Sequence, residues 1–128
     1  MLIKPRKLWH KEARSEFIKL RDWLESQDVL EDVDSMELML FGDTYHRYIT
    51  AVEAYLISGL TTDNTKGVPV KAPEVVIAET AIRQLSKIKD DLGALVRNRK
   101  LESRLNKDYA AKIEDDFDQF MKGSKRES

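Results

Sequence analysis

The sequence predicts an all-α protein with about four helices. Apolar residues recur at three- and four-residue steps along most of the chain, as they do on one face of a helix. The hydrophobic fraction is 41% and the charged fraction is 35%, a balance typical of helical proteins with solvated outer faces. A chain of 128 residues is long enough for one domain with a modest core. We therefore expect a single helical domain at 8–121 with its core at 8–95, a basic arm at 1–7 and a flexible tail at 122–128.

The first predicted helix spans residues 8–27. Pro5 keeps the first few residues of the chain out of this helix. The apolar residues of the segment would share one face of the helix, which predicts that this face packs against the rest of the domain. These residues are Trp9, Ala13, Phe17, Leu20 and Leu24.

The second predicted helix spans residues 35–58, with Asp34 as its cap and Glu37 three residues on, as in a capping box. Gly59 is expected to end it. Apolar and aromatic residues follow Leu38 at alternating steps of three and four, the spacing of a helix that packs along another helix. Because tyrosine is enriched at interfaces, this row is either a subunit interface or a wide core face whose hydroxyls reach the rim. The candidate interface residues are Phe41, Tyr45, Tyr48, Val52 and Tyr55.

The third predicted helix spans residues 73–92 and forms a long antiparallel pair with the second. A polar connection at 61–73 joins them, and it is long enough to form a short extended piece of its own. Pro73 suits the first turn of the helix. Nearly half of the helix circumference is apolar, so this helix is expected to be the most buried, and Gly93 is expected to end it.

A C-terminal helical segment at 97–121 is the fourth predicted element. Its first half is basic and its second half is acidic. We expect its last apolar side chains, Phe117, Phe120 and Met121, either to dock on a partner or to pack within an oligomer. The apolar residues at helical spacing are Leu101, Leu105, Tyr109, Ile113, Phe117 and Phe120.

No arrangement of residues in the sequence predicts catalysis, a metal site or a cofactor. The only histidines, His10 and His46, have no partner at a metal-ligand spacing such as HExxH. The doublets Asp90–Asp91 and Asp115–Asp116 diverge by about 100° around a helix and do not form general acid/base pairs. There is no glycine-rich phosphate loop and no cysteine. We therefore expect a protein that is not an enzyme, with no membrane-spanning or signal segment.

The charges are unevenly distributed although the net charge is only −1. Cations without acids begin the chain, acids dominate residues 31–64, and cations return at 97–112. Opposite blocks of this kind can pair within a chain or between subunits, and surface solvation also tolerates them. Arg97, Arg99 and Lys100 therefore either contact DNA or pair with Asp90, Asp91 or a neighbouring acidic helix.

The order of these elements resembles the small subunit of phage terminases, a family associated with tailed phages and prophages of bacteria. The resemblance covers about residues 8–105. It rests on an acid-opened long helix (31–60), a polar connection containing glycine (61–73), a proline-started helix (73–93) and a corner with Leu92, Gly93, Arg99 and Leu101 at matching steps. Leu95 and Val96 stand where the family often has threonine and proline.

The resemblance implies a non-catalytic subunit in the cytoplasm of the bacterial host. Such a subunit recognises double-stranded viral DNA, assembles as a homo-oligomeric ring and recruits the large subunit, which carries the ATPase and nuclease activities. The alternative is a helical phage structural or adaptor protein, a head-assembly or connector component that oligomerises without DNA recognition. The candidate DNA contacts are Lys4, Arg6, Lys7, Lys11 and Arg14, with Arg97, Arg99, Lys100 and Arg104 as a second set. The candidate contacts of the large subunit are Phe117, Phe120 and Met121.

Overall fold

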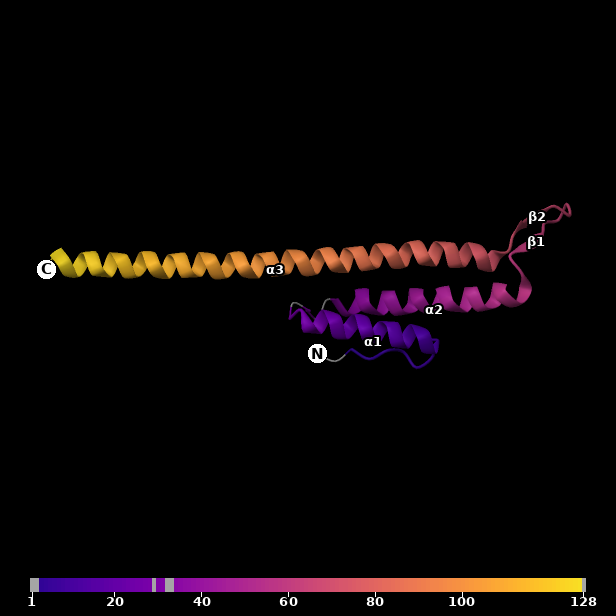
Figure 1. Cartoon of the computed structure of the whole chain (residues 1–128), viewed down its shortest axis with the longest axis horizontal. Coiled ribbons are helices and arrows are strands. Elements are labelled where there is room, and N and C mark those ends of the chain that lie inside the picture. The colour runs from indigo at the N-terminus through magenta and orange to yellow at the C-terminus, as the bar shows by residue number, and fades with distance from the viewer. Residues whose placement is uncertain (1–2, 29, 32–33, 128) are drawn as a thin grey trace.

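A computed structural model describes residues 3–28, 30–31 and 34–127, with side chains up to residue 122. Helices α1 (Lys11–Ser26), α2 (Ser35–Ser58) and α3 (Pro73–Glu127) lie in one row, with α2 between the other two (Figure 1). Within these residues no helix is long and apolar enough to cross a membrane. The all-α prediction is thus confirmed in outline.

Helices α2 and α3 form the predicted antiparallel pair. A small hairpin joins them, made of β1 (Thr61–Asp63) and β2 (Pro69–Lys71), with Thr62 opposite Val70. At its turn, Asn64 Oδ1 accepts from the backbone N–H groups of Lys66 at 2.8 Å and Val68 at 3.0 Å. The connection at 61–73 is therefore a short extended piece, as its length suggested.

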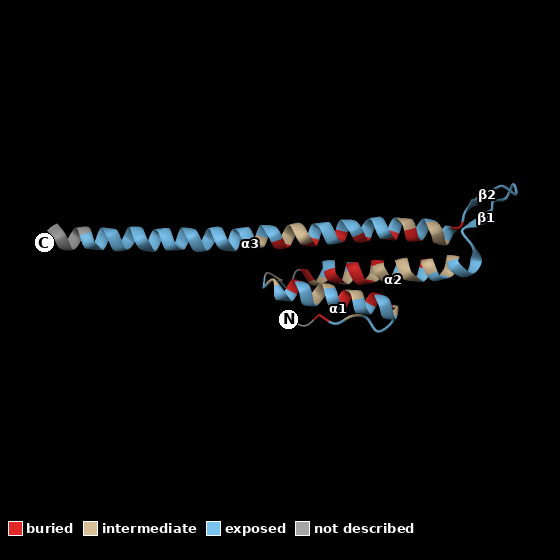
Figure 2. Ribbon diagram, viewed as in Figure 1, coloured by how far each residue is buried: buried red, intermediate tan, exposed pale blue. Residues whose placement is uncertain are grey.

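The core lies where all three helices and the arm meet, and it uses the apolar rows expected from the sequence. Figure 2 shows that the buried residues gather on facing sides of α1, α2 and the first half of α3. The apolar rows that predicted the helices therefore line the core of the folded protein. The central buried residues are Trp9, Phe17, Leu24, Leu38, Phe41, Leu85, Ile88, Leu92 and Val96.

Three helices are present within the described residues, where about four were expected, because α3 does not stop at Gly93. It continues through the expected corner and includes residues 122–127, which the sequence suggested as a tail. Gly93 has no positive φ, and the buried Leu92 and Val96 flank it on the core side of one helix. A glycine inside a helix costs only about 1 kcal/mol relative to alanine, so core packing on both sides carries the helix through it.

The ends of the first two helices also differ in detail from expectation. Helix α1 begins at Lys11, and Leu8, placed in the helix by sequence, is 93% exposed. Asp34 precedes α2 but makes no side-chain capping hydrogen bond. Its carboxylate is turned toward Arg99 of α3, so the expected capping box is wrong.

Candidate functional site

The basic arm continues through Trp9 to His10, just before α1, and from here on the term arm includes these residues; Trp9 anchors it to the helical body. Its indole is 5% exposed, lies 5.2 Å from the Phe17 ring between centroids and donates from Nε1 to Asp43 Oδ1 at 2.8 Å. Farther back along the arm, Arg21 Nη1 donates to the Ile3 carbonyl oxygen at 2.8 Å. The arm is therefore held on α1 and α2 at both of these points.

Gly42 makes the Trp9 anchor possible. A Cβ at this position would lie 2.0 Å from Trp9 Cη2, so the ring occupies the space that any other side chain would need. The sequence analysis missed this contact. The available signal was a glycine inside an otherwise regular helical row, which commonly marks a close approach.

The two histidines continue the same junction between the arm and α2. His10 Nδ1 accepts from the Glu12 N–H at 3.1 Å and caps α1. In the neutral ring Nε2 is then the donor, and it lies 2.6 Å from Glu53 Oε1. His46 Nδ1 accepts from the backbone N–H of His10 at 2.7 Å. Both rings thus have structural contacts. Asp43 accepts from Trp9 and lies 3.2 Å from Arg6 Nε.

The first set of candidate DNA contacts lies on this anchored arm and the start of α1. All five side chains are exposed. Arg6 is partly neutralised by Asp43, whereas the others have no ion pair within the part of the chain that the structure describes. Four cations therefore remain available at this end of the molecule: Lys4, Lys7, Lys11 and Arg14.

The second set is divided by the structure. Arg99 bonds to the buried Asp34 carboxylate and lies 3.3 Å from Glu31 Oε2, and Lys100 Nζ hydrogen-bonds to Gln27 Oε1. Arg97 and Arg104 are exposed, and neither has an ion pair among the described residues. Arg99 and Lys100 therefore join α3 to the end of α1 and to the α1–α2 connection. The acids that pair with Arg99 lie in this connection, and they are not Asp90 or Asp91.

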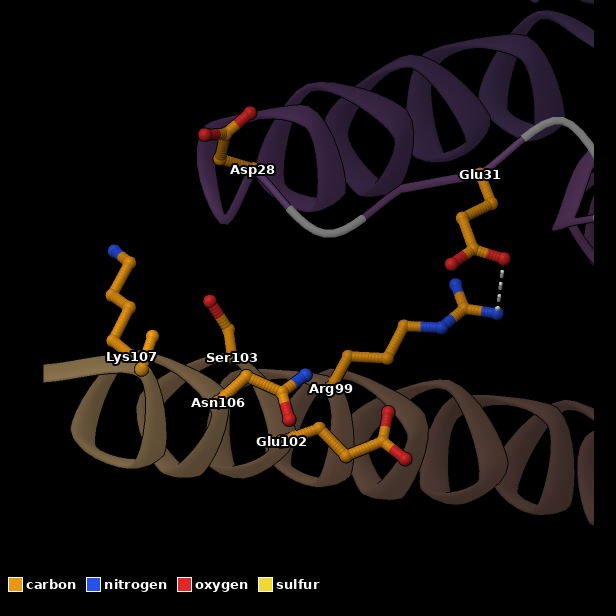
Figure 3. A pocket seen from close by; sticks show the side chains of 8 residues that line it. Asp28, Glu31, Arg99, Glu102, Ser103, Asn106 and Lys107 are labelled. Atoms are coloured by element: carbon orange, nitrogen blue, oxygen red, sulfur yellow. Dashed lines mark ion pairs between the residues drawn. The ribbon is translucent and has the colours of Figure 1, made fainter. Parts of the chain in front are cut away.

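A cleft opens where α3 leaves the body, and Arg99 lies at its inner end. Figure 3 shows Arg99 reaching from α3 to Glu31, with Asp28 above and Lys107 farther along the helix. The hydrogen bond to Asp34 raises the pKa of Arg99, and burial acts in the opposite direction, so the guanidinium stays charged. No group of three or more metal-binding side chains occurs in the described ranges. The lining residues are Asp28, Glu31, Arg99, Glu102, Ser103, Asn106, Lys107 and Ala110.

The candidate interface row on α2 is partly a core face. Phe41 is 1% exposed and belongs to the core, and Tyr45 and Tyr48 pack against that core with their ring centroids 6.0 Å apart. Burial and the nearby Glu16 and Glu12 raise the pKa of Tyr45. Val52 and Tyr55 are partly exposed farther along the helix. Phe41 is therefore not available to a partner, because its own chain covers it.

A family model described as "Phage terminase, small subunit" matches residues 13–104. The chain belongs to this family. No curated protein and no solved structure matches the chain. The match covers nearly all of α1, the whole of α2, the hairpin and the part of α3 that packs on the body, so the shared unit of the terminase small subunit is the three-helix body.

The rest of α3 lies beyond the matched range and projects from the terminase body. Its predicted apolar row is exposed along its whole length. Phe117, Phe120 and Met121, the candidate contacts of a large subunit, lie at its far end and are 61%, 71% and 43% exposed.

Proposed function

We propose that this terminase family member is the non-catalytic small subunit of a phage packaging machine. It recognises viral DNA, assembles as a homo-oligomeric ring and recruits the large ATPase-nuclease subunit in the cytoplasm of the bacterial host. The family membership carries this proposal. The anchored cations Lys4, Lys7, Lys11 and Arg14 support its DNA-binding part.

A near-neutral chain can bind DNA if its weak cationic patch is repeated. In a ring every subunit brings the same four cations near one duplex, so each further contact forms at high effective concentration. Phosphate contacts of this kind release counterions and make affinity fall steeply with salt. Anchoring by Trp9 reduces the freedom that the arm would lose on binding.

The ring would join different patches of neighbouring subunits, head to tail. With Phe41 covered, the proposed contribution of α2 is reduced to Tyr45, Tyr48, Val52 and Tyr55, whose partly exposed edges remain on the surface. The exposed far end of α3, with Phe117, Phe120 and Met121, would be covered either by the large subunit or by a second copy of this chain.

Reversing three cations of the arm region should weaken DNA binding and flatten its salt dependence. For Lys7→Glu/Lys11→Glu/Arg14→Glu we expect at least a tenfold loss of affinity and a salt slope lower by roughly 3, about one unit for each phosphate that is no longer neutralised. Fluorescence anisotropy with packaging-site DNA across a salt series measures both quantities.

The matched control reverses three exposed cations elsewhere, Lys66→Glu/Arg83→Glu/Lys87→Glu. If both triple variants lost the same DNA affinity, the loss would depend only on net charge, which would contradict a specific role for the arm. An assembled wild-type protein that binds no DNA at low salt would instead favour the structural or adaptor alternative.

A further inference from the structure

The far half of α3 exposes an apolar row that nothing in its own chain covers. After Lys100 the helix leaves the body, and the side chains at 101–122 are all exposed (Figure 2). A lone helix is marginally stable in water, and large exposed apolar patches mark interaction surfaces. This segment is therefore expected to be covered by a partner. The row consists of Leu101, Leu105, Tyr109, Ile113, Phe117, Phe120 and Met121, which are 43–71% exposed.

The charges beside this row fix the direction in which a second copy can lie on it. In the half toward the body the cations Arg104, Lys107 and Lys112 outnumber the acids Glu102 and Asp108, and toward the far end the acids Glu114, Asp115, Asp116 and Asp118 outnumber Lys122. Two parallel copies would place like charges beside each other. Two antiparallel copies place the basic half of each beside the acidic half of the other, which is favourable at close range.

We propose that the far halves of α3 from two copies of this chain pack against each other in antiparallel orientation. The pairing rests on the homo-oligomer part of the proposed function and adds a second contact to it. Neighbours within a head-to-tail ring share one polarity, so an antiparallel pair would join subunits of two different rings. The pairing does not depend on DNA binding, so the two proposals can fail separately. An antiparallel pair has two-fold symmetry, and every contact in it occurs twice.

One register satisfies the apolar row along its length. When Leu105 of one copy lies at the height of Phe117 of the other, Tyr109 lies at the height of Ile113, and Leu101 at that of Met121. In the same register six of the seven residues of the row face another large apolar side chain, whereas Phe120 lies at the height of Glu102. Aromatic side chains such as Tyr109 and Phe117 bury the most area in contacts of this kind.

The same register also brings opposite charges together on both flanks. At roughly 100° per residue, Lys107 and Glu114 lie on one edge of the apolar row, and Asp108 and Lys112 lie on the other edge. In an antiparallel pair each edge meets the same edge of the partner. Lys107 therefore lies beside Glu114 of the second copy, and Lys112 lies beside Asp108. The two charged pairs are offset from the apolar register by only one and two residues, about 1.5 and 3 Å along the axis, which these side chains can span.

The spacing of the row indicates where the contact is closest. From Leu101 to Phe117 the steps are four residues, so the row leans around the helix as an i±4 ridge. Two helices that keep this row in contact must wind around each other, because the row turns by about 40° around the helix at each step. The contact is then centred on Tyr109 and Ile113. Substitutions there should matter most.

Disulfide cross-linking tests the direction of the pairing, because the chain contains no cysteine of its own. Leu105→Cys and Phe117→Cys variants of the full chain are mixed and mildly oxidised. Residues 105 and 117 of one chain are about 18 Å apart along the axis. Antiparallel pairing thus predicts a mixed dimer joining 105 to 117 and little dimer from either variant alone. A dimer from Leu105→Cys alone would indicate parallel helices and overturn the proposal.

Two further variants show that the cross-link depends on the inferred contacts. Adding Ile113→Asp to both cysteine variants should reduce the mixed dimer at least tenfold, whereas Leu56→Asp, at an exposed site on α2, should not. Circular dichroism checks that the body stays folded. Lys107→Glu should also reduce the yield, and adding Glu114→Lys should restore it.

The competing occupant is the large subunit. A chain that gives no mixed dimer, and whose Ile113→Asp variant loses binding to the large subunit, would assign the row to that partner and overturn self-pairing. A mixed dimer whose yield is unchanged by Ile113→Asp would also overturn it, because the cross-link would then reflect random collision.

Discussion

Replacing Gly42 with alanine should lower the free energy of unfolding by about 3 kcal/mol and displace the Trp9 indole. The new Cβ would lie 2.0 Å from Trp9 Cη2 and 2.4 Å from Cζ3, well inside van der Waals contact. The ring cannot yield in place, because it is 5% exposed and packed on Phe17. Its displacement also breaks the hydrogen bond to Asp43 and releases the basic arm from α2.

Urea unfolding followed by circular dichroism measures the loss of stability. Tryptophan fluorescence in a Trp23→Phe background reports on Trp9 alone, since the chain has 2 tryptophans, and should shift to the red. Gly93→Ala is the matched control. Its Cβ would be 3.6 Å from Arg97 Nη1, an ordinary contact inside α3, so this change should stabilise the protein by roughly 0.5–1 kcal/mol. Equal effects of the two substitutions would contradict the steric argument.

The contrast between these two glycines shows how far the sequence predicts the fold. The apolar periods locate all three helices of the body, and the second matches Ser35–Ser58 closely. At Gly93 a local stop signal competes with packing of Leu92 and Val96 on the core, and packing prevails. At Gly42 the signal of a close approach is local, but its partner lies in the arm 33 positions earlier. A single sequence does not identify such a partner.

The candidate site is less predictable than the fold for the same reason. Arg97 and Arg99 are equivalent as sequence features, yet they point about 160° apart around α3. One remains exposed, whereas the other meets Asp34, which lies 65 positions away in sequence. Charge alone makes both of them candidates for DNA contact or for an ion pair. Only the placement of the α1–α2 connection beside α3 separates the cation that binds its own chain from the one that faces solvent.

Replacing Arg99 with methionine should lower the free energy of unfolding by about 3 kcal/mol. Asp34 is 3% exposed, and its Oδ2 accepts from the Glu31 N–H at 2.9 Å as well as from the Arg99 guanidinium. Removing one member of a buried pair leaves the other charge away from water with fewer partners. Methionine keeps the aliphatic part of the side chain, so the loss reports mainly on the guanidinium. Urea unfolding of the full chain measures it.

Two comparisons separate this structural role of Arg99 from a role in DNA binding. Arg97→Met, at an exposed neighbouring position, should change stability by less than about 0.5 kcal/mol. Asp34→Asn combined with Arg99→Met should recover about half of the loss, because a neutral amide is less costly to bury than a carboxylate. A folded Arg99→Met variant should keep the wild-type salt slope for DNA, since the guanidinium already binds its own chain. If the Arg99→Met variant had wild-type stability and a reduced salt slope for DNA binding, Arg99 would be a DNA contact and not a structural residue.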